Sequence, residues 1–166
     1  AVLYVEGMVA SLDRGERREA RPRPVPGADA QSFAIHQLAE ARILVIDEAQ
    51  ACLALAKRAI TAYLESEGDK MHLLNVPGTL QTARGGLWFL DQPRAAAMIG
   101  ACADYIQRQM LEAPARPSEQ MLETLADALA SLEYYLEAGT LLPDEHSDVL
   151  DLAADSVRAL GMPVAA

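Results

Sequence analysis

Apolar residues recur at helical spacing along most of the chain, and five segments carry this pattern. From residue 30 onward they repeat every three or four positions, as one buried face of an α-helix requires, and the breaks fall at Pro, Gly and capping residues. The pattern predicts helices over residues 31–67, 77–90, 92–112, 118–139 and 144–160. The predicted core positions are Ile43, Ile46, Leu53, Ile60, Leu64, Ile99, Cys102, Ile106, Met110, Leu122, Leu125, Leu129, Leu132, Leu136, Val149, Ala153, Val157 and Leu160.

The residues at the helix ends support these boundaries. Asp91 and Ser118 are suitable N-caps for the third and fourth helices, because a short polar side chain accepts a hydrogen bond from the first turn. Gly139 and Gly161 are placed to end the fourth and fifth helices. Strand-favouring runs are missing after the first dozen residues, so we expect no sheet in the core.

Helices of similar length joined by short connections favour an up-down arrangement. We therefore predict an all-α fold, an antiparallel up-down four-helix bundle with an extra helix and an N-terminal extension. Residues 1–12 are predicted to be the end of a preceding segment, and 13–29, rich in Pro and Arg, to be a linker. Residues 30–163 form the predicted bundle domain. Because the chain lacks an initiator Met, we expect a segment of a longer protein.

Charge and apolar run length exclude several classes of protein. The net charge of −10 argues against nucleic-acid binding, which depends on neutralising phosphates. No apolar run reaches the roughly 18 residues that span a bilayer, and we expect a cytoplasmic location. Cys52 and Cys102 lie inside apolar helical runs, which favours buried free thiols over a disulfide.

The stretch LQTARGGLWFL, residues 80–90, has two different faces on a helical wheel. Leu80, Ala83, Leu87 and Leu90 fall on an apolar side. The opposite side carries Gln81, Arg84, Gly85 and Trp88, and a Trp on an outer face usually finds burial or a partner. We interpret these four residues as a docking face.

The segment Gln81-Thr82-Ala83-Arg84-Gly85 resembles the His-x-x-Lys-Gly signature of histidine-phosphotransfer (HPt) domains. A longer set of segments, VPGTLQTARGGL, PRAAAMIGACADYI, LADALASLEYYLEAG and LDLAADSVRALG, is similar to N-terminal HPt-like regions of CheA-like hybrid sensor kinases of type IV pilus and twitching-motility systems. The resemblance covers about residues 40–163. It implies an HPt-like helical bundle that takes part in a two-component phosphorelay with response regulators.

Gln81 stands at the position of the phospho-accepting histidine, while Arg84 and Gly85 match the basic residue and the glycine. A carboxamide has its nitrogen lone pair delocalised into the carbonyl and cannot attack phosphorus as a neutral imidazole does. The resemblance therefore implies a phosphotransfer-inactive module, with Gln81 as a degenerate phosphotransfer position, that acts by docking.

No other residue set points to catalysis. None of His36, His72 and His146 has a basic residue and a glycine at the signature spacing, and His72 is the least unlikely substitute for Gln81. No Glu precedes a histidine by three residues, as a di-metal carboxylate bundle needs, and the two cysteines are not spaced as metal ligands. We expect no enzyme activity of this chain alone, no metal and no cofactor.

Two functions from different classes remain open. In the first, the module docks response regulator receiver domains, or other domains of the same kinase, through the face of Gln81 to Trp88. In the second, the chain is a structural or dimerisation spacer of the kinase, as a possible homodimer, and that face is covered. Exposure of Trp88, the single Trp of the chain, discriminates between them.

Overall fold

A computed structural model of the chain describes residues 27–139 and 147–162. The predicted terminal segment 1–12, nearly all of the predicted linker 13–29 and the start of the predicted fifth helix at residue 144 lie outside the described residues. His146 lies outside them too. The predicted domain ranges 1–12, 13–29 and 30–163 therefore stay predictions.

The described residues form helices and contain no strand, which confirms the all-α prediction. The elements are α2 (Ala28–Glu65), the 3₁₀-helix η1 (Lys70–Leu73), α3 (Val76–Phe89), α4 (Pro93–Tyr105), the π-helix η2 (Ile106–Leu111), α5 (Glu119–Gly139) and α6 (Ser147–Ala159). Each of the five predicted helices thus has an observed counterpart. The third predicted helix corresponds to α4 followed directly by the π-helix η2.

The chain divides into two compact units, Ala1–Ala39 and Glu40–Ala166. In the first unit the described residues belong to the beginning of α2, and Phe33, Ile35 and Leu38 are exposed there. The buried core residues all belong to the second unit.

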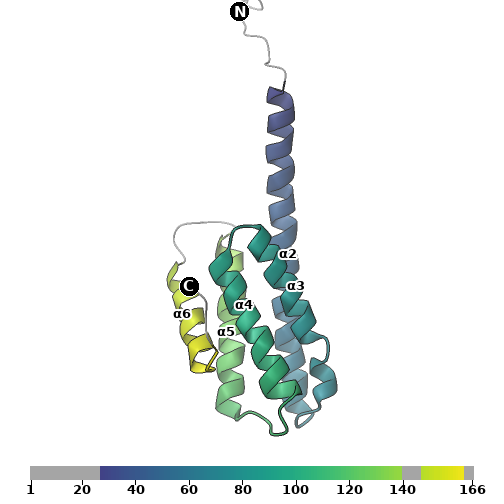
Figure 1. Ribbon diagram of the computed structural model, residues 1–166, viewed down its shortest axis with the longest axis vertical. Coiled ribbons are helices and arrows are strands. Elements are labelled where there is room, and N and C mark those ends of the chain that lie inside the picture. Colours follow the sequence, from purple (N-terminus) through teal and green to yellow (C-terminus); the bar gives the residue numbers. More distant parts are fainter. Residues whose placement is uncertain (1–26, 140–146, 163–166) are drawn as a thin grey trace, which may run out of the picture. The chain divides into compact units, whose positions relative to one another are not determined.

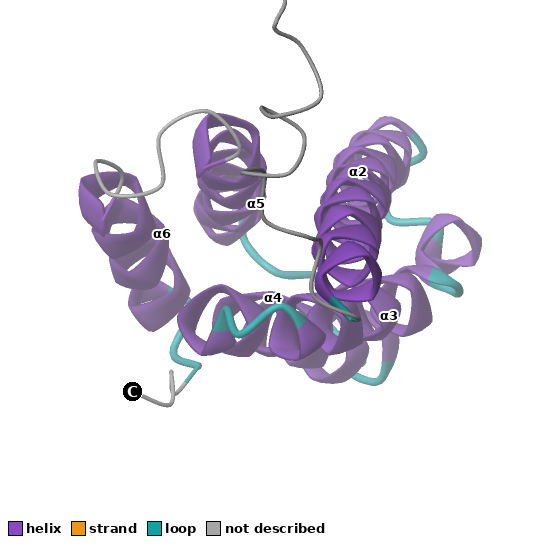
Figure 2. Cartoon of the chain, turned by 90° about the horizontal axis from the view of Figure 1, so that it is seen from above, coloured by secondary structure: helices purple, strands orange, loops and turns teal. Residues whose placement is uncertain are grey.

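Helices α3 and α4 lie side by side in the second unit, and α5 and α6 form another close pair (Figures 1 and 2). Helix α4 also contacts α5 and α6, so it links the two pairs. Polar contacts reinforce this link, because Tyr135 Oη donates to Gln92 Oε1 at 2.7 Å and Arg94 pairs with Asp151 at 2.7 Å. Lys57 and Glu133 form an ion pair between α2 and α5.

The core is built mainly from the predicted positions. The leucine series of α5, from Leu122 to Leu136, is buried throughout, and so are Ile99, Cys102, Ile106 and Met110. Two predicted core residues of α2 are exposed instead, Ile43 by 55% and Leu64 by 37%. Ile43 lies ten residues before Leu53, about 80° off the buried stripe, and Leu64 lies in the last turn of the helix.

Small residues account for the error in α2. Ala49 and Ala56 are completely buried and fill the stripe between Ile46, Leu53 and Ile60. A search for large apolar side chains passes over them. In α6, Leu150 is buried while the predicted Val149 is only partly buried.

Asp91 has a different role from the one predicted. Gln92, not Asp91, occupies the N-cap position of α4, and it makes no side-chain cap hydrogen bond. Asp91 has a φ of 60° and ends α3, with its N–H donating to Trp88 O and the Gln92 N–H donating to Leu87 O. These two hydrogen bonds form a Schellman motif, in which the left-handed residue follows the last helical turn. The predictions for Ser118 and Gly161 are confirmed, because Met121 N donates to Ser118 Oγ at 3.2 Å and Gly161 has a φ of 81°.

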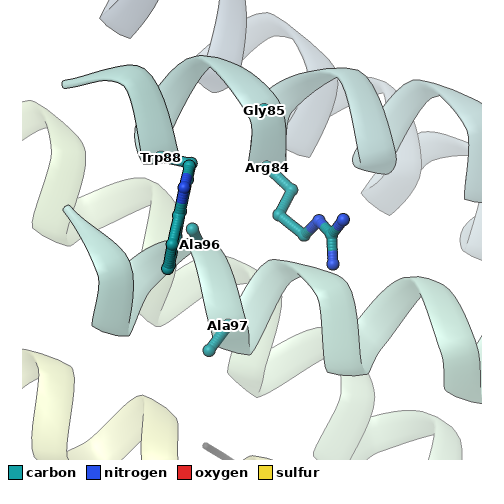
Figure 3. A pocket seen from close by; sticks show the side chains of 5 residues that line it. All are labelled: Arg84, Gly85, Trp88, Ala96 and Ala97. Atoms are coloured by element: carbon teal, nitrogen blue, oxygen red, sulfur yellow. The ribbon is translucent and has the colours of Figure 1, made fainter. Parts of the chain in front are cut away.

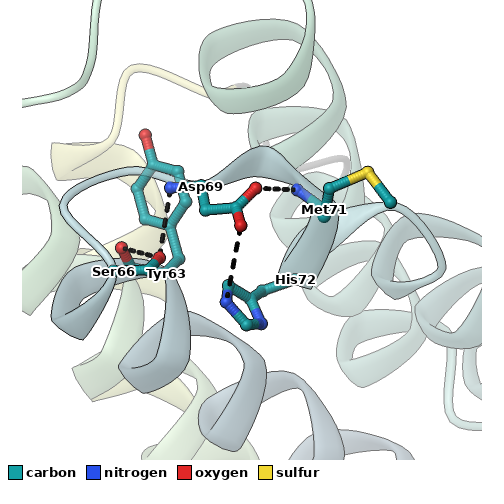
Figure 4. A network of polar contacts seen from close by, with 5 residues as sticks. All are labelled: Tyr63, Ser66, Asp69, Met71 and His72. Atoms are coloured by element: carbon teal, nitrogen blue, oxygen red, sulfur yellow. Dashed lines mark hydrogen bonds and ion pairs between the residues drawn. The ribbon is translucent and has the colours of Figure 1, made fainter.

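The loop between α2 and α3 contains η1, which the apolar pattern did not predict. Asp69 caps it, accepting a hydrogen bond from Met71 N at 3.0 Å, and Ser66 accepts one from Asp69 N at 3.1 Å (Figure 4). Lys70 Nζ donates to the carbonyls of Leu111 at 3.1 Å and Ala113 at 2.8 Å. This lysine therefore holds η1 against the end of η2.

Candidate functional site

Helix α3 presents the two faces that the sequence predicts. Leu80, Ala83 and Leu87 are buried in the core. On the other side Gln81 is partly exposed, and Arg84 and Gly85 are exposed. Trp88 is 67% exposed, so the described residues leave most of the single Trp of the chain uncovered.

The glycine pair of α3 divides into one open and one packed position. A Cβ on Gly85 would meet nothing within 4 Å, whereas a Cβ on Gly86 would lie 2.8 Å from Cγ1 of Val45 in α2. Gly86 therefore permits the close approach of α2 and α3. Gly85 leaves the outer face of α3 open.

Trp88, Arg84 and Gly85 line an open pocket together with Ala96 and Ala97 of α4 (Figure 3). Its volume is about 340 Å³, and its surface is mainly apolar. In Figure 3 the indole ring stands between α3 and the beginning of α4, and the Arg84 side chain reaches toward α4 further along the same groove. We call this the α3/α4 pocket.

Arg84 rests on Gly100 of α4. A Cβ on Gly100 would lie 2.9 Å from Cδ of Arg84 and 3.6 Å from its Nη1, so a larger residue at this position would require the arginine stem to shift. Within the described part of the chain, no acidic side chain lies within ion-pair distance of Arg84. The guanidinium thus keeps its donors available beside the pocket.

The structure brings three of the four predicted docking residues together around one pocket. Gln81 is one turn before Arg84 in α3 but does not line the pocket. An exposed indole next to an unpaired guanidinium is a typical contact surface for another protein. Their role in docking stays a prediction.

The second wall of the pocket was missing from the sequence prediction. Ala96, Ala97 and Gly100 come from the segment PRAAAMIG, whose run of small residues at the start of α4 is the signal that could have revealed it. Small residues allow neighbouring helices to approach closely, but the sequence alone does not say which helix approaches.

Two of the three histidines lie in the described ranges. His72 is an exposed residue of η1, and its Nε2 is 3.9 Å from Oδ2 of Asp69 (Figure 4). His36 is an exposed residue of the first unit. Neither lines the α3/α4 pocket.

The cysteines and the carboxylates are the remaining groups with possible chemistry. Cys52 and Cys102 are both buried free thiols, as predicted, and burial raises the pKa of Cys102 to about 12. Among the described residues, no group of three or more His, Cys, Asp or Glu side chains is arranged to hold a metal ion. None of the helices in the described ranges has a stretch long and apolar enough to cross a membrane.

Comparison with known proteins supplies the family. Residues 36–157 match the family model described as FimL C-terminal domain. Over 168 aligned residues the chain is 69% identical to the protein named Scaffold protein FimL of Pseudomonas aeruginosa. The alignment covers 100% of this chain and 30% of that relative, so the chain spans under a third of the relative's length.

No solved structure gives a significant match to the chain. The relative's name describes a scaffold and does not refer to a kinase or to phosphotransfer, so the resemblance to HPt-like regions of hybrid kinases stays a prediction. The family model covers most of the chain, including all of α3, α4 and α5. The chain therefore belongs to the FimL C-terminal domain family.

Proposed function

We propose that this chain is a signalling module that docks response regulator receiver domains without exchanging phosphoryl groups with them. In this proposal the second unit is an antiparallel up-down bundle of the HPt type, and α6 is the extra helix. The three residues between α3 and α4 support antiparallel neighbours, because so short a connection joins helices that run in opposite directions. A scaffold role of the relative is in keeping with a module that acts by binding.

The observation that carries the proposal is the open α3/α4 pocket one turn after Gln81. Arg84 and Gly85 match the basic residue and the glycine that follow the phospho-accepting histidine in the resembling domains, while Gln81 offers only hydrogen bonds. Trp88 adds an exposed aromatic side chain to the same pocket. A partner that recognises these residues would bind the face and find no nucleophile. In this proposal the face binds a receiver domain but cannot accept a phosphoryl group from it.

Binding of purified receiver domains from two-component systems tests this function. Trp88→Ala should weaken the binding of a receiver domain at least about tenfold, since exposed aromatic anchors dominate protein interfaces. Leu152→Ala is the matched control, because Leu152 is an exposed apolar residue of α6 that does not line the pocket. Equal affinity of both variants, or no binding of any receiver domain to the wild type, would contradict the proposal.

A second candidate function, a dimerisation spacer, is favoured by a different observation. Helix α2 carries seven of the thirteen large hydrophobic side chains that are exposed in the described ranges. Exposed apolar side chains such as Ile35 and Leu38 could be covered by a second copy of the chain. Sedimentation equilibrium would support this function if it gave a dimer mass that Ile35→Ser with Leu38→Ser reduces to the monomer mass.

A further inference from the structure

The α3/α4 pocket has a charge opposite to that of the chain around it. Of the five described residues that line it, Arg84 is charged and the others are Gly85, Trp88, Ala96 and Ala97. The chain as a whole has a net charge of −10. A lone cation with no acidic neighbour in its pocket, on an acidic protein, is a selective feature for an anionic group.

The side chain of Arg84 lies against Gly100 of α4. Its stem lies on Gly100, with Cδ and Cγ 2.9 Å and 3.9 Å from the place that a Cβ of Gly100 would take. The stem is thus laid along the surface of α4, and the guanidinium is held near the pocket. A guanidinium presents a planar fork of N–H donors that matches the two oxygens of a carboxylate.

The rest of the pocket suits an apolar group. The Trp88 ring and the methyl groups of Ala96 and Ala97 form its walls, and Gly85 adds no side chain that would fill it. A volume of about 340 Å³ exceeds what one aliphatic side chain needs, so such a chain enters without rearrangement. A ligand that combines an apolar group with an anion a few ångströms away meets both parts of the site.

We propose that the α3/α4 pocket binds a segment of a partner protein that places an apolar side chain against Trp88 and a single carboxylate on Arg84. A carboxylate is favoured over a phosphate because a dianion usually takes more than one cation, and Arg84 is the single basic residue among the described residues that line the pocket. That the ligand is part of a protein rests on the proposed docking function. The preference for a carboxylate is independent of that function, because it follows from Arg84 and the apolar walls of the pocket.

Two small probes test the preference with the fluorescence of Trp88, the single Trp of the chain. N-acetyl-leucine carries an apolar group and a carboxylate, and N-acetyl-leucinamide is its neutral counterpart. With the 166-residue chain, N-acetyl-leucine should change the emission with a Kd of roughly millimolar, as its size allows. N-acetyl-leucinamide should bind at least about tenfold more weakly, because it lacks the charge-assisted hydrogen bonds.

Variants test whether Arg84 causes the difference in affinity between N-acetyl-leucine and N-acetyl-leucinamide. Arg84→Gln should make the two probes bind equally weakly, and Gly100→Ala should reduce their difference by displacing the arginine stem. Arg108→Gln removes the same charge from an exposed arginine of η2 outside the pocket, and it should leave the difference unchanged. Circular dichroism of each variant checks that it is folded.

Equal binding of both probes to the wild type, no binding of N-acetyl-leucine, or a difference that persists in Arg84→Gln would overturn the proposal. The result is independent of the receiver-domain experiment. Probe binding without receiver binding would keep the carboxylate site and reject the proposed docking partner. Receiver binding without a probe difference would keep the docking function and reject the carboxylate site.

Discussion

At the scale of single residues, Gly85 and Gly86 are neighbours in α3 with opposite surroundings. Alanine in a helix interior is more favourable than glycine by roughly 0.5–1 kcal/mol. At Gly85 nothing opposes this gain, whereas a Cβ on Gly86 meets Val45 Cγ1 at 2.8 Å. The Val side chain is stiff at χ1 and cannot turn away freely.

Gly85→Ala is therefore expected to raise the free energy of unfolding by about 0.5–1 kcal/mol, and Gly86→Ala to lower it by about 1–3 kcal/mol. Urea unfolding of the two variants measures both. Changes of the same sign in the free energy of unfolding would contradict the close contact between Gly86 of α3 and Val45 of α2.

Burial also separates the chemistry of Cys102 from that of an ordinary thiol. Its pKa is raised from 9.0 to about 12, so at pH 8 the reactive thiolate is scarce and the native protein should resist thiol reagents. The unfolded thiol ionises near pH 9 while the folded one stays neutral. The stability contribution of the neutral form is thus complete below pH 9 and is lost as the pH rises from 9 toward 12.

Urea midpoints at pH 8 and pH 10 measure this loss. The wild type should lose more stability over the interval than Cys102→Ala, which has no thiol to ionise in its place. Equal losses of stability in the two proteins would show that ionisation of Cys102 does not contribute to the pH dependence of unfolding.

At the scale of elements, η1 depends on one lysine. Lys70 Nζ donates two hydrogen bonds to carbonyls at the end of η2, and Lys70→Met keeps most of the stem while removing both. We expect a loss of about 1–3 kcal/mol, the cost of leaving partly buried carbonyls without a charged donor. Hydrogen exchange should accelerate in η1 and η2 first, and exchange that changes equally in α6 would contradict the local role.

The leucine series of α5 gives a larger effect. Leu129 is completely buried, so Leu129→Ala should cost about 2–5 kcal/mol through lost burial and a residual cavity. Gln81→Ala, on a partly exposed side chain, should stay within about 0.5 kcal/mol. Thermal melts compare the two variants, and equal melting temperatures would contradict the assignment of the core.

The apolar pattern predicts the helices well because each helix buries one continuous stripe. The pattern does not predict features that depend on contacts with other segments of the chain. Asp91 reads as an N-cap in sequence, but the left-handed turn that it forms belongs to the end of α3. Helix η1 carries no periodic pattern in four residues, and its anchor, Lys70, acts through carbonyls more than forty residues away.

One part of the candidate site can be predicted from the sequence, and the other part depends on how the helices pack. The outer face of α3 follows from a helical wheel, because Gln81, Arg84, Gly85 and Trp88 belong to one helix. The wall from α4 and the seat of Arg84 on Gly100 depend on how two helices pack, which one sequence does not specify. The carboxylate preference could therefore be inferred only from the structure.

At the scale of the whole molecule, the chain is an acidic all-helical member of the FimL C-terminal domain family. The described residues place a mainly apolar pocket with a single cation on one side of α3. The chain spans 30% of the length of its scaffold relative. We propose that this module acts by recognising a partner protein and transfers no phosphoryl group.

A phosphotransfer assay tests this central claim most directly. Receiver domains labelled with radioactive phosphate are mixed with the wild type, with Gln81→His and with His72→Ala. The wild type should take up no label, because Gln81 cannot form a phosphoramidate, and Gln81→His should gain acid-labile label since Arg84 and Gly85 keep the surrounding frame. Acid-labile label on the wild type would contradict the account, and its loss in His72→Ala would assign the transfer to His72.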